Sequence, residues 1–173
     1  MDYPPKKKKE TKKKGKNDIE SATQTVFRFL SYRNRSVEEV KRKLQEKGFP
    51  PFAINRALAR IKELGYLNDH EYAYSFACAS IENKQWGTVR IHDVLAHKGI
   101  PQEIINTTIA IIKKEYDITE VARSALETRF IQFRSPQPAD KKTRKKAIDF
   151  LKRKGFTWDT IATVIINTQD TGC

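Results

Sequence analysis

The residues that could carry out catalysis or hold a metal ion are few, and their spacing argues against both roles. His70 lies between Asp69 and Glu71, but acidic side chains placed in this way are typical of the first turn of a helix, where they complement the helix dipole. His92 and His97 are five positions apart, whereas two histidines that share a metal on one helix are about four positions apart. The chain has no glycine-rich phosphate loop and no nucleophile elbow. We therefore expect no catalytic activity, no metal site and no cofactor.

The basic residues give a stronger indication of function. The chain of 173 residues has a formal net charge of +13, which favours a polyanionic partner such as nucleic acid or a nucleoprotein. Cations gather near the starts of three predicted helices, where they could attract phosphates independently of base sequence. The candidate nucleic-acid-binding residues are Arg33, Arg35, Lys41, Lys84, Trp86, Arg90, Lys141, Lys142, Lys145 and Lys146.

These candidates also have structural interpretations. A lysine-rich face can simply keep a small helix soluble without touching a phosphate. Trp86 can be a partly exposed stacking or interface residue, or it can close a small hydrophobic core, and of the two we favour the core. Both interpretations of the lysines are compatible with the sequence.

The elements that must position these residues are organised around a short stretch that occurs three times. Residues 44–49, 95–100 and 151–156 each run from a leucine through Lys-Gly to a large apolar residue. This pattern ends a helix, because a cation favours the C-terminal end of the helix dipole and glycine accepts the left-handed turn. We expect a helix end and a positive φ at each of the three glycines, Gly48, Gly99 and Gly155.

The apolar spacing on either side of each stretch predicts helices. Upstream, Ser36, Gly87 and Thr143 occupy equivalent positions and are acceptable N-caps. Downstream, Pro51 and Pro101 lie where a second helix should begin. The predicted helices are residues 21–32, 36–47, 51–64, a helix that starts after residue 68, then 88–98, 101–115, a helix from 117 or 119 to 130 or 133, 139–154 and 157–167.

The repeat divides the chain into a tail and three similar units. Residues 1–17 are rich in lysine and almost free of apolar residues, so we expect a disordered basic tail. Three-helix repeats follow at residues 18–65, 66–116 and 117–173. Because strand signals are almost absent, we predict an all-α fold in which three tandem three-helix repeats form an elongated, curved array.

The remaining composition bears on the compartment. Cys78 and Cys173 are isolated, which suits a reducing environment rather than a disulfide framework. No apolar run approaches the roughly 18 residues of a membrane span, and the N-terminus lacks the apolar core of a signal peptide. We therefore expect a cytoplasmic protein without a membrane partner.

Several motifs together resemble the bacterial RecX family of regulatory proteins. They are residues 36–49, the Leu-Gly-Tyr-Leu-Asn-Asp turn at 64–69 with Tyr-Ala at 72–73, and Gly-Thr-Val-Arg-Ile at 87–91 running into Leu95 and Gly99. The resemblance covers the chain from roughly Thr25 to the C-terminus, and it is looser in the third repeat. It implies tandem three-helix repeats and a non-catalytic protein that restrains the RecA recombinase.

The resemblance also implies partners. A member of this family lies along the groove of the active RecA–DNA filament, bridges neighbouring subunits, and inhibits ATP hydrolysis and strand exchange. We therefore expect the RecA filament and single- and double-stranded DNA as partners, a role in DNA repair and recombination, and a monomeric chain. In this interpretation ATP belongs to RecA and not to this protein.

An alternative is a free-standing DNA-binding protein whose helix-turn-helix-like repeats enter the grooves of DNA. Reading bases would need Arg, Asn or Gln on an exposed recognition helix of each repeat. The last helix of the first repeat offers Asn55, Arg56 and Arg60, and that of the second offers Gln102 and Asn106. The third repeat has few such residues, and this inconsistency favours recognition of shape and charge over base sequence.

Overall fold

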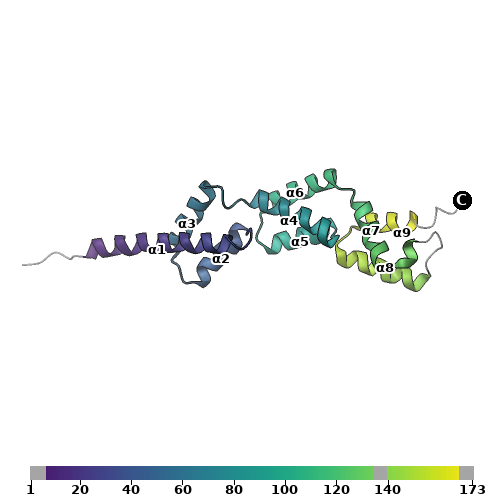
Figure 1. The fold of residues 1–173 in the computed structure, drawn as a ribbon, viewed down its shortest axis with the longest axis horizontal. Coiled ribbons are helices and arrows are strands. Elements are labelled where there is room, and N and C mark those ends of the chain that lie inside the picture. Colours follow the sequence, from purple (N-terminus) through teal and green to yellow (C-terminus); the bar gives the residue numbers. More distant parts are fainter. Residues whose placement is uncertain (1–6, 135–139, 168–173) are drawn as a thin grey trace, which may run out of the picture. The chain divides into compact units, whose positions relative to one another are not determined.

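The described part of the chain is built entirely from helices. The computed structural model describes residues 7–134 and 140–167 (Figure 1), and within them no strand is formed. The helices are α1 (Lys7–Leu30), α2 (Val37–Glu46), α3 (Pro51–Glu63), α4 (Asp69–Lys84), α5 (Thr88–His97), α6 (Gln102–Glu115), α7 (Ile118–Arg129), the short 3-10 helix η1 (Ile131–Arg134), α8 (Lys141–Lys154) and α9 (Trp158–Asn167). The predicted all-α class with three three-helix repeats is confirmed.

The chain forms two compact units. Unit 1 holds Met1–Tyr72 together with Lys98–Ile100, and unit 2 holds Ala73–His97 and Pro101–Cys173. Three residues that follow α5 therefore belong to unit 1, although the rest of their repeat is in unit 2.

Unit 1 contains α1, α2 and α3, which pack against one another in all three pairings. Apolar residues at helical spacing on each helix face inward, because burial of apolar surface is the main favourable contribution to packing. The core consists of Ala22, Val26, Val40, Leu44, Ile54, Ala57, Leu58, Ile61 and Leu67.

The first helix is longer than the sequence indicated. α1 begins at Lys7 instead of near Ser21, so it extends into the basic segment of residues 1–17. Lysine is a good helix former, and a helix already fixed by the buried residues Ala22 and Val26 can extend at low cost, since only nucleation is expensive.

Unit 2 contains α4 from Ala73 onward and all later helices, with α7, α8 and α9 packed pairwise and α5 packed on α6. Its largest core joins residues from α7, η1, α8 and α9: Ala122, Ala125, Leu126, Phe133, Ala147, Leu151, Phe156, Ile161, Val164 and Ile165. Ile91 and Leu95 of α5 and Ile105 and Ile112 of α6 are also fully or almost fully buried.

The N-cap of α8 differs from the prediction. It is Asp140 rather than Thr143, while the observed bounds, Lys141–Lys154, lie close to the predicted range 139–154. The Asp140 carboxylate accepts hydrogen bonds from the Thr143 backbone N–H at 2.9 Å and from its hydroxyl at 2.8 Å. Because aspartate is a strong N-cap, α8 gains one turn that α2 and α5 do not have.

The three predicted helix stops are confirmed. Gly48, Gly99 and Gly155 have φ angles of 78°, 73° and 85°, in the left-handed region that favours glycine. At two of the three stops the chain also closes a six-residue turn, from the Phe49 N–H to the Leu44 carbonyl and from the Phe156 N–H to the Leu151 carbonyl, each at 3.2 Å. The bonds satisfy carbonyls that the helix ends would otherwise leave free.

Candidate nucleic-acid interface

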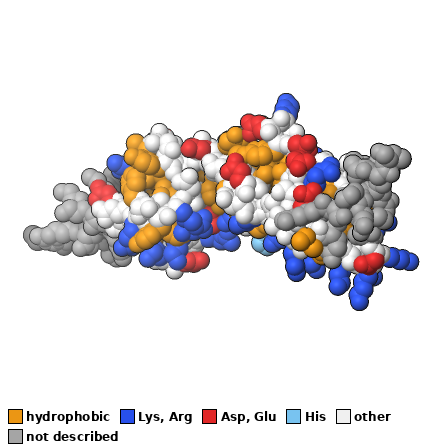
Figure 2. Space-filling view, turned by 45° about the vertical axis from the view of Figure 1, so that its right-hand side comes forward, with side chains coloured by type: hydrophobic (Ala, Val, Ile, Leu, Met, Phe, Trp, Pro, Cys, Tyr) orange, Lys and Arg blue, Asp and Glu red, His pale blue; other side chains and the backbone are white. Residues whose placement is uncertain are grey.

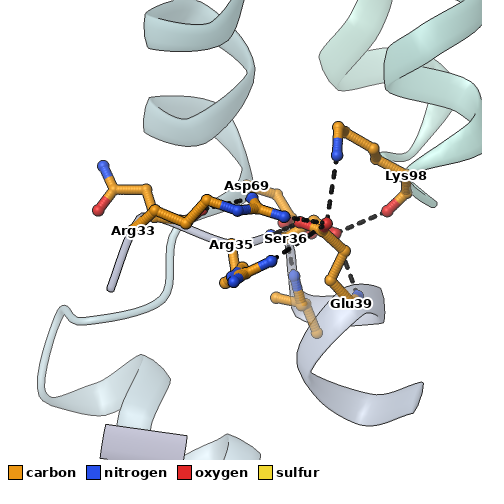
Figure 3. A network of polar contacts seen from close by, with 8 residues as sticks. Arg33, Arg35, Ser36, Glu39, Asp69 and Lys98 are labelled. Carbon is orange, nitrogen blue, oxygen red and sulfur yellow. Dashed lines mark hydrogen bonds and ion pairs between the residues drawn. The ribbon is translucent and has the colours of Figure 1, made fainter. Parts of the chain in front are cut away.

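The start of α2 is tied to the helix stop that follows α5, and we call this contact the first junction (Figure 3). Ser36 is fully buried, and its hydroxyl accepts a hydrogen bond from the Glu39 N–H at 3.1 Å while donating one to the Lys98 carbonyl at 2.6 Å. The Val37 N–H donates to the Asp69 carboxylate at 2.9 Å. All of these residues belong to unit 1.

Glu39 neutralises the cations of the first junction (Figure 3). One of its carboxylate oxygens lies 3.0 Å from Arg33, 3.2 Å from Lys98 and 4.0 Å from Arg35. Burial alone would raise the pKa of Glu39, but the hydrogen bonds from Arg33, the Ser36 backbone and Lys98 outweigh it and lower the pKa to about 2. The carboxylate is therefore ionised at neutral pH, and the three cations share it.

The remaining candidate of unit 1 is also paired. Lys41 lies 3.7 Å from the Glu38 carboxylate, and Arg35 stacks on Phe29 at 4.2 Å from the ring centroid. Arg33, Arg35 and Lys41 are thus engaged with carboxylates of their own unit, which lowers their capacity to attract an external anion.

The start of α5 makes the corresponding contact in unit 2, which we call the second junction. Here the Gly87 N–H donates to the Lys154 carbonyl at 2.8 Å, and the Val89 N–H donates to the Gly155 carbonyl at 3.0 Å. A methyl group added at Gly87 would overlap the backbone of Gly155, and one added at Gly155 would overlap Arg90. The two backbones therefore touch directly, where the first junction has a serine hydroxyl between them.

Trp86 holds two cations at the second junction. The Lys84 ammonium lies 4.5 Å and the Arg90 guanidinium 4.3 Å from its ring centroid, and the edge of Phe76 packs nearby at 6.4 Å. The indole is half-buried, so it combines a packing role with cation–π contacts. The position agrees with neither of the two predicted roles alone.

Backbone carbonyls fix the cations of the second junction further. The Lys154 ammonium donates to the Lys84 carbonyl at 2.6 Å, and the Arg90 guanidinium donates to the Arg153 carbonyl at 2.9 Å. Burial lowers the pKa of Lys154, and the nearby Arg90 charge lowers it further. Within the described residues, no carboxylate forms an ion pair with Lys84, Arg90 or Lys154.

The four candidate lysines of α8 lie on its exposed surface. Lys141, Lys142, Lys145 and Lys146 are all exposed, and among the described residues none of them forms an ion pair. Figure 2 shows Lys and Arg side chains projecting along the lower edge of the part that holds α8. Their charges are therefore accessible to an external anion.

Sequence reasoning missed Lys98 and Lys154, which lie just before the glycines of two repeats. Their place in the repeat predicts a helix end and gives no sign of a contact with another helix. The structure adds that each contributes a backbone carbonyl and an ammonium group to a junction.

The residues around His70 make contacts of a helix start. The Asn68 side chain accepts from the His70 N–H at 3.0 Å as a helix cap, and Asp69 instead binds the Val37 N–H. In the described part of the chain, no three His, Cys, Asp or Glu side chains could together hold a metal ion. None of the helices described there is long and apolar enough to cross a membrane.

Comparison with known families gives matches along most of the chain. Residues 22–60 match the first three-helix domain of RecX, residues 68–109 the second, and residues 115–165 the third. Among similar proteins, the regulatory protein RecX of Chlorobaculum tepidum is 36% identical over 82% of this chain and 84% of its own length. That of Trichlorobacter lovleyi is 30% identical over 85% of this chain and 95% of its own.

Solved structures give the same fold. The crystal structure of RecX from Lactobacillus salivarius matches 88% of this chain with a TM-score of 0.75 at 23% identity, and covers 97% of that chain. A second crystal structure of a regulatory protein RecX matches 95% of this chain and 79% of its own, with a TM-score of 0.77 at 22% identity.

Proposed function

Because the chain belongs to the RecX family, we propose that it is a non-catalytic regulator that binds the RecA–DNA filament and inhibits RecA recombinase and ATPase activity. The observation that carries the proposal is the similarity, over most of both chains, to relatives named as regulatory proteins. The net charge of +13 supports it, since the filament carries DNA phosphates.

The partners follow from the same proposal. They are the RecA filament and its single- or double-stranded DNA. In this proposal the chain acts as a monomer in the cytoplasm and takes part in DNA repair and recombination. We assign the phosphate contacts to the candidate cations of unit 2, because the candidate cations of unit 1 are paired with Glu38 and Glu39.

The alternative, a free-standing reader of base sequence, has less support. Gln102 and Asn106, the polar candidates of the second repeat, are hydrogen-bonded to each other at 2.9 Å, and Gln102 also contacts the His92 ring at 2.9 Å. Side chains already engaged in this way must break bonds before they can read a base edge.

A titration into a RecA ATPase assay on single-stranded DNA tests the proposal. We expect ATP hydrolysis to fall at protein concentrations well below those that coat the same DNA without RecA. Inhibition that sets in only when the DNA is saturated would instead mean simple competition for DNA, and the free-standing DNA-binding protein would be the better description.

A further inference from the structure

We propose that the second junction is a binding site for the phosphate backbone of nucleic acid, formed by Lys84, Arg90 and Lys154 around Trp86, and that the first junction is not such a site. The choice of nucleic acid as the polyanion rests on the proposed function. The site itself rests on the geometry and charge of the two junctions.

The two junctions place residues of opposite charge at one equivalent position. Ser36 and Gly87 correspond in the repeat, so Glu39 and Arg90, each three residues later, correspond as well. In the first junction a carboxylate stands at this position and binds Arg33 and Lys98. In the second, a guanidinium stands there, beside Lys154 and Lys84.

The cations of the second junction are held by groups that leave their charge uncompensated. Lys84 and Arg90 lie over an aromatic ring, and Arg90 and Lys154 donate to neutral backbone carbonyls. A guanidinium has five N–H donors and an ammonium three, so both retain donors for an anion. Because the side chains are already ordered, less conformational entropy is lost when an anion binds.

Mutual repulsion among these cations supports an anion site. Arg90 lies close enough to Lys154 to contribute to the lowered pKa of its ammonium, in addition to the effect of burial. An anion bound between them would reverse this effect, because an opposite charge favours the protonated form. At the first junction the Glu39 carboxylate is already the opposite charge beside the cations.

The contacts favour a phosphate over a base. Arginine binds phosphate oxygens with two parallel N–H groups, and the ring of Trp86 is engaged by two cations of its own chain. The neighbouring amide of Gln85 is bonded to the Ser124 hydroxyl at 3.0 Å. We therefore expect binding without base preference.

The central experiment compares Arg90→Glu with Arg42→Glu. Both variants change the net charge equally, but Arg42 is exposed on α2 in unit 1 and is not one of the residues that form either junction. Binding of a labelled oligothymidylate is followed by fluorescence anisotropy over a series of salt concentrations, without RecA. The salt slope is the slope of the logarithm of the binding constant against the logarithm of the salt concentration. Its magnitude should decrease by about 0.7 to 1.4 in Arg90→Glu, because each lost contact on a single strand removes about 0.7. The decrease in Arg42→Glu should be less than half as large.

A second variant guards against misfolding. Lys84→Gln removes an exposed charge without touching the glycine contact, and its slope should also fall by about 0.7, with an unchanged far-ultraviolet circular dichroism spectrum. In a Trp158→Phe background, Trp86 is the remaining tryptophan, and the oligonucleotide should change its emission in a salt-reversible way. Unchanged Trp86 emission at saturating oligonucleotide would overturn the site.

The outcomes separate the site from the proposed function. If Arg90→Glu and Lys84→Gln bind the oligonucleotide with the parent's salt slope, the site is overturned, whatever happens to RecA inhibition. If they keep that slope but lose binding to DNA-free RecA, the junction takes an acidic protein surface and the proposal also fails. If they lose oligonucleotide binding, the site stands, and the parent's effect in the RecA ATPase assay then decides the proposed function independently.

Discussion

The two junctions join the start of α2 or α5 to the Lys-Gly helix stop of the following repeat, yet the charged groups around them differ. In both, the carbonyl of the lysine before the glycine is the acceptor, but the donor is a serine hydroxyl in the first and a glycine N–H in the second. The first surrounds a carboxylate with cations, and the second gathers cations with no carboxylate paired to them among the residues that the structure describes. Packing and charge are thus set by different atoms, so one can change while the other is retained.

The absence of a side chain at Gly87 explains part of the difference. Without a Cβ, the backbone at the start of α5 approaches Gly155 closely enough for direct N–H to carbonyl bonds. At the first junction the serine side chain bridges a longer gap, and Gly99 instead packs on the methylene groups of Glu38.

The largest expected effect is on the glycines of the second junction. Gly155→Ala should destabilise unit 2 by about 2–4 kcal/mol, because it adds overlap with Arg90 to the strain of a left-handed backbone. Gly48→Ala should cost only about 1–2 kcal/mol, from its φ alone, since an added methyl meets no atom within 4 Å.

Urea denaturation measures this difference. Both tryptophans, Trp86 and Trp158, lie in unit 2, so their fluorescence follows unit 2, while circular dichroism follows both units. Equal costs for Gly155→Ala and Gly48→Ala would show that the second junction is not tightly packed.

The next largest effect is on the carboxylate of the first junction. Glu39→Gln should destabilise unit 1 by about 1–3 kcal/mol, because it leaves charged hydrogen-bond donors without their anion. The neighbouring Glu38→Gln is the matched control and should cost less than about 0.5 kcal/mol, since its ion pair with Lys41 is exposed. Similar losses for the two variants in thermal unfolding would contradict a central role for Glu39.

The pH dependence of stability should follow the same carboxylate. The pKa of Glu39 is lowered from its ordinary 4.5 to about 2 in the folded protein, so the unfolded chain binds the proton first as the pH falls. Its contribution is therefore complete above pH 4.5 and is lost between pH 4.5 and about 2. Melting temperatures recorded across this range should fall less steeply for Glu39→Gln than for the parent, and parallel curves would refute the assignment.

The smallest effect on stability is expected for the lysines of α8. Replacing Lys141, Lys142, Lys145 and Lys146 with glutamine should change the free energy of unfolding by only a few tenths of a kcal/mol each. The salt slope for single-stranded DNA should nevertheless fall by up to about two to three units.

Deletion of residues 1–17 is the control for the lysine variant. Should this deletion abolish the salt slope while the four-lysine variant binds DNA like the parent, the α8 lysines would be only a solvated face.

Sequence alone predicted the features that depend on residues close to one another in the chain. Ser36 as an N-cap and the left-handed Gly48, Gly99 and Gly155 depend on residues a few positions away, so their spacing was sufficient. The contact of Lys98 with Glu39 joins residues 59 positions apart, and no local sequence pattern predicts it. Most of the cations were therefore predicted, but Lys98 and Lys154 were not, and neither was the difference between cations with and without a neighbouring carboxylate.

Two details at helix starts were predicted incorrectly. The N-cap of α8 was assigned to Thr143 by analogy with Ser36 and Gly87, whereas the observed cap is Asp140. The start of α1 was placed where apolar residues begin, although a fixed helix can extend through lysines that bury nothing.

The use of a main-chain carbonyl as the acceptor in both junctions has an evolutionary consequence. Every copy of the Lys-Gly stop supplies that carbonyl whatever its side chains are, so a duplicated gene segment would encode a repeat that already fits its neighbour. Its surface charges could then drift under selection for a new partner, as Glu39 and Arg90 illustrate.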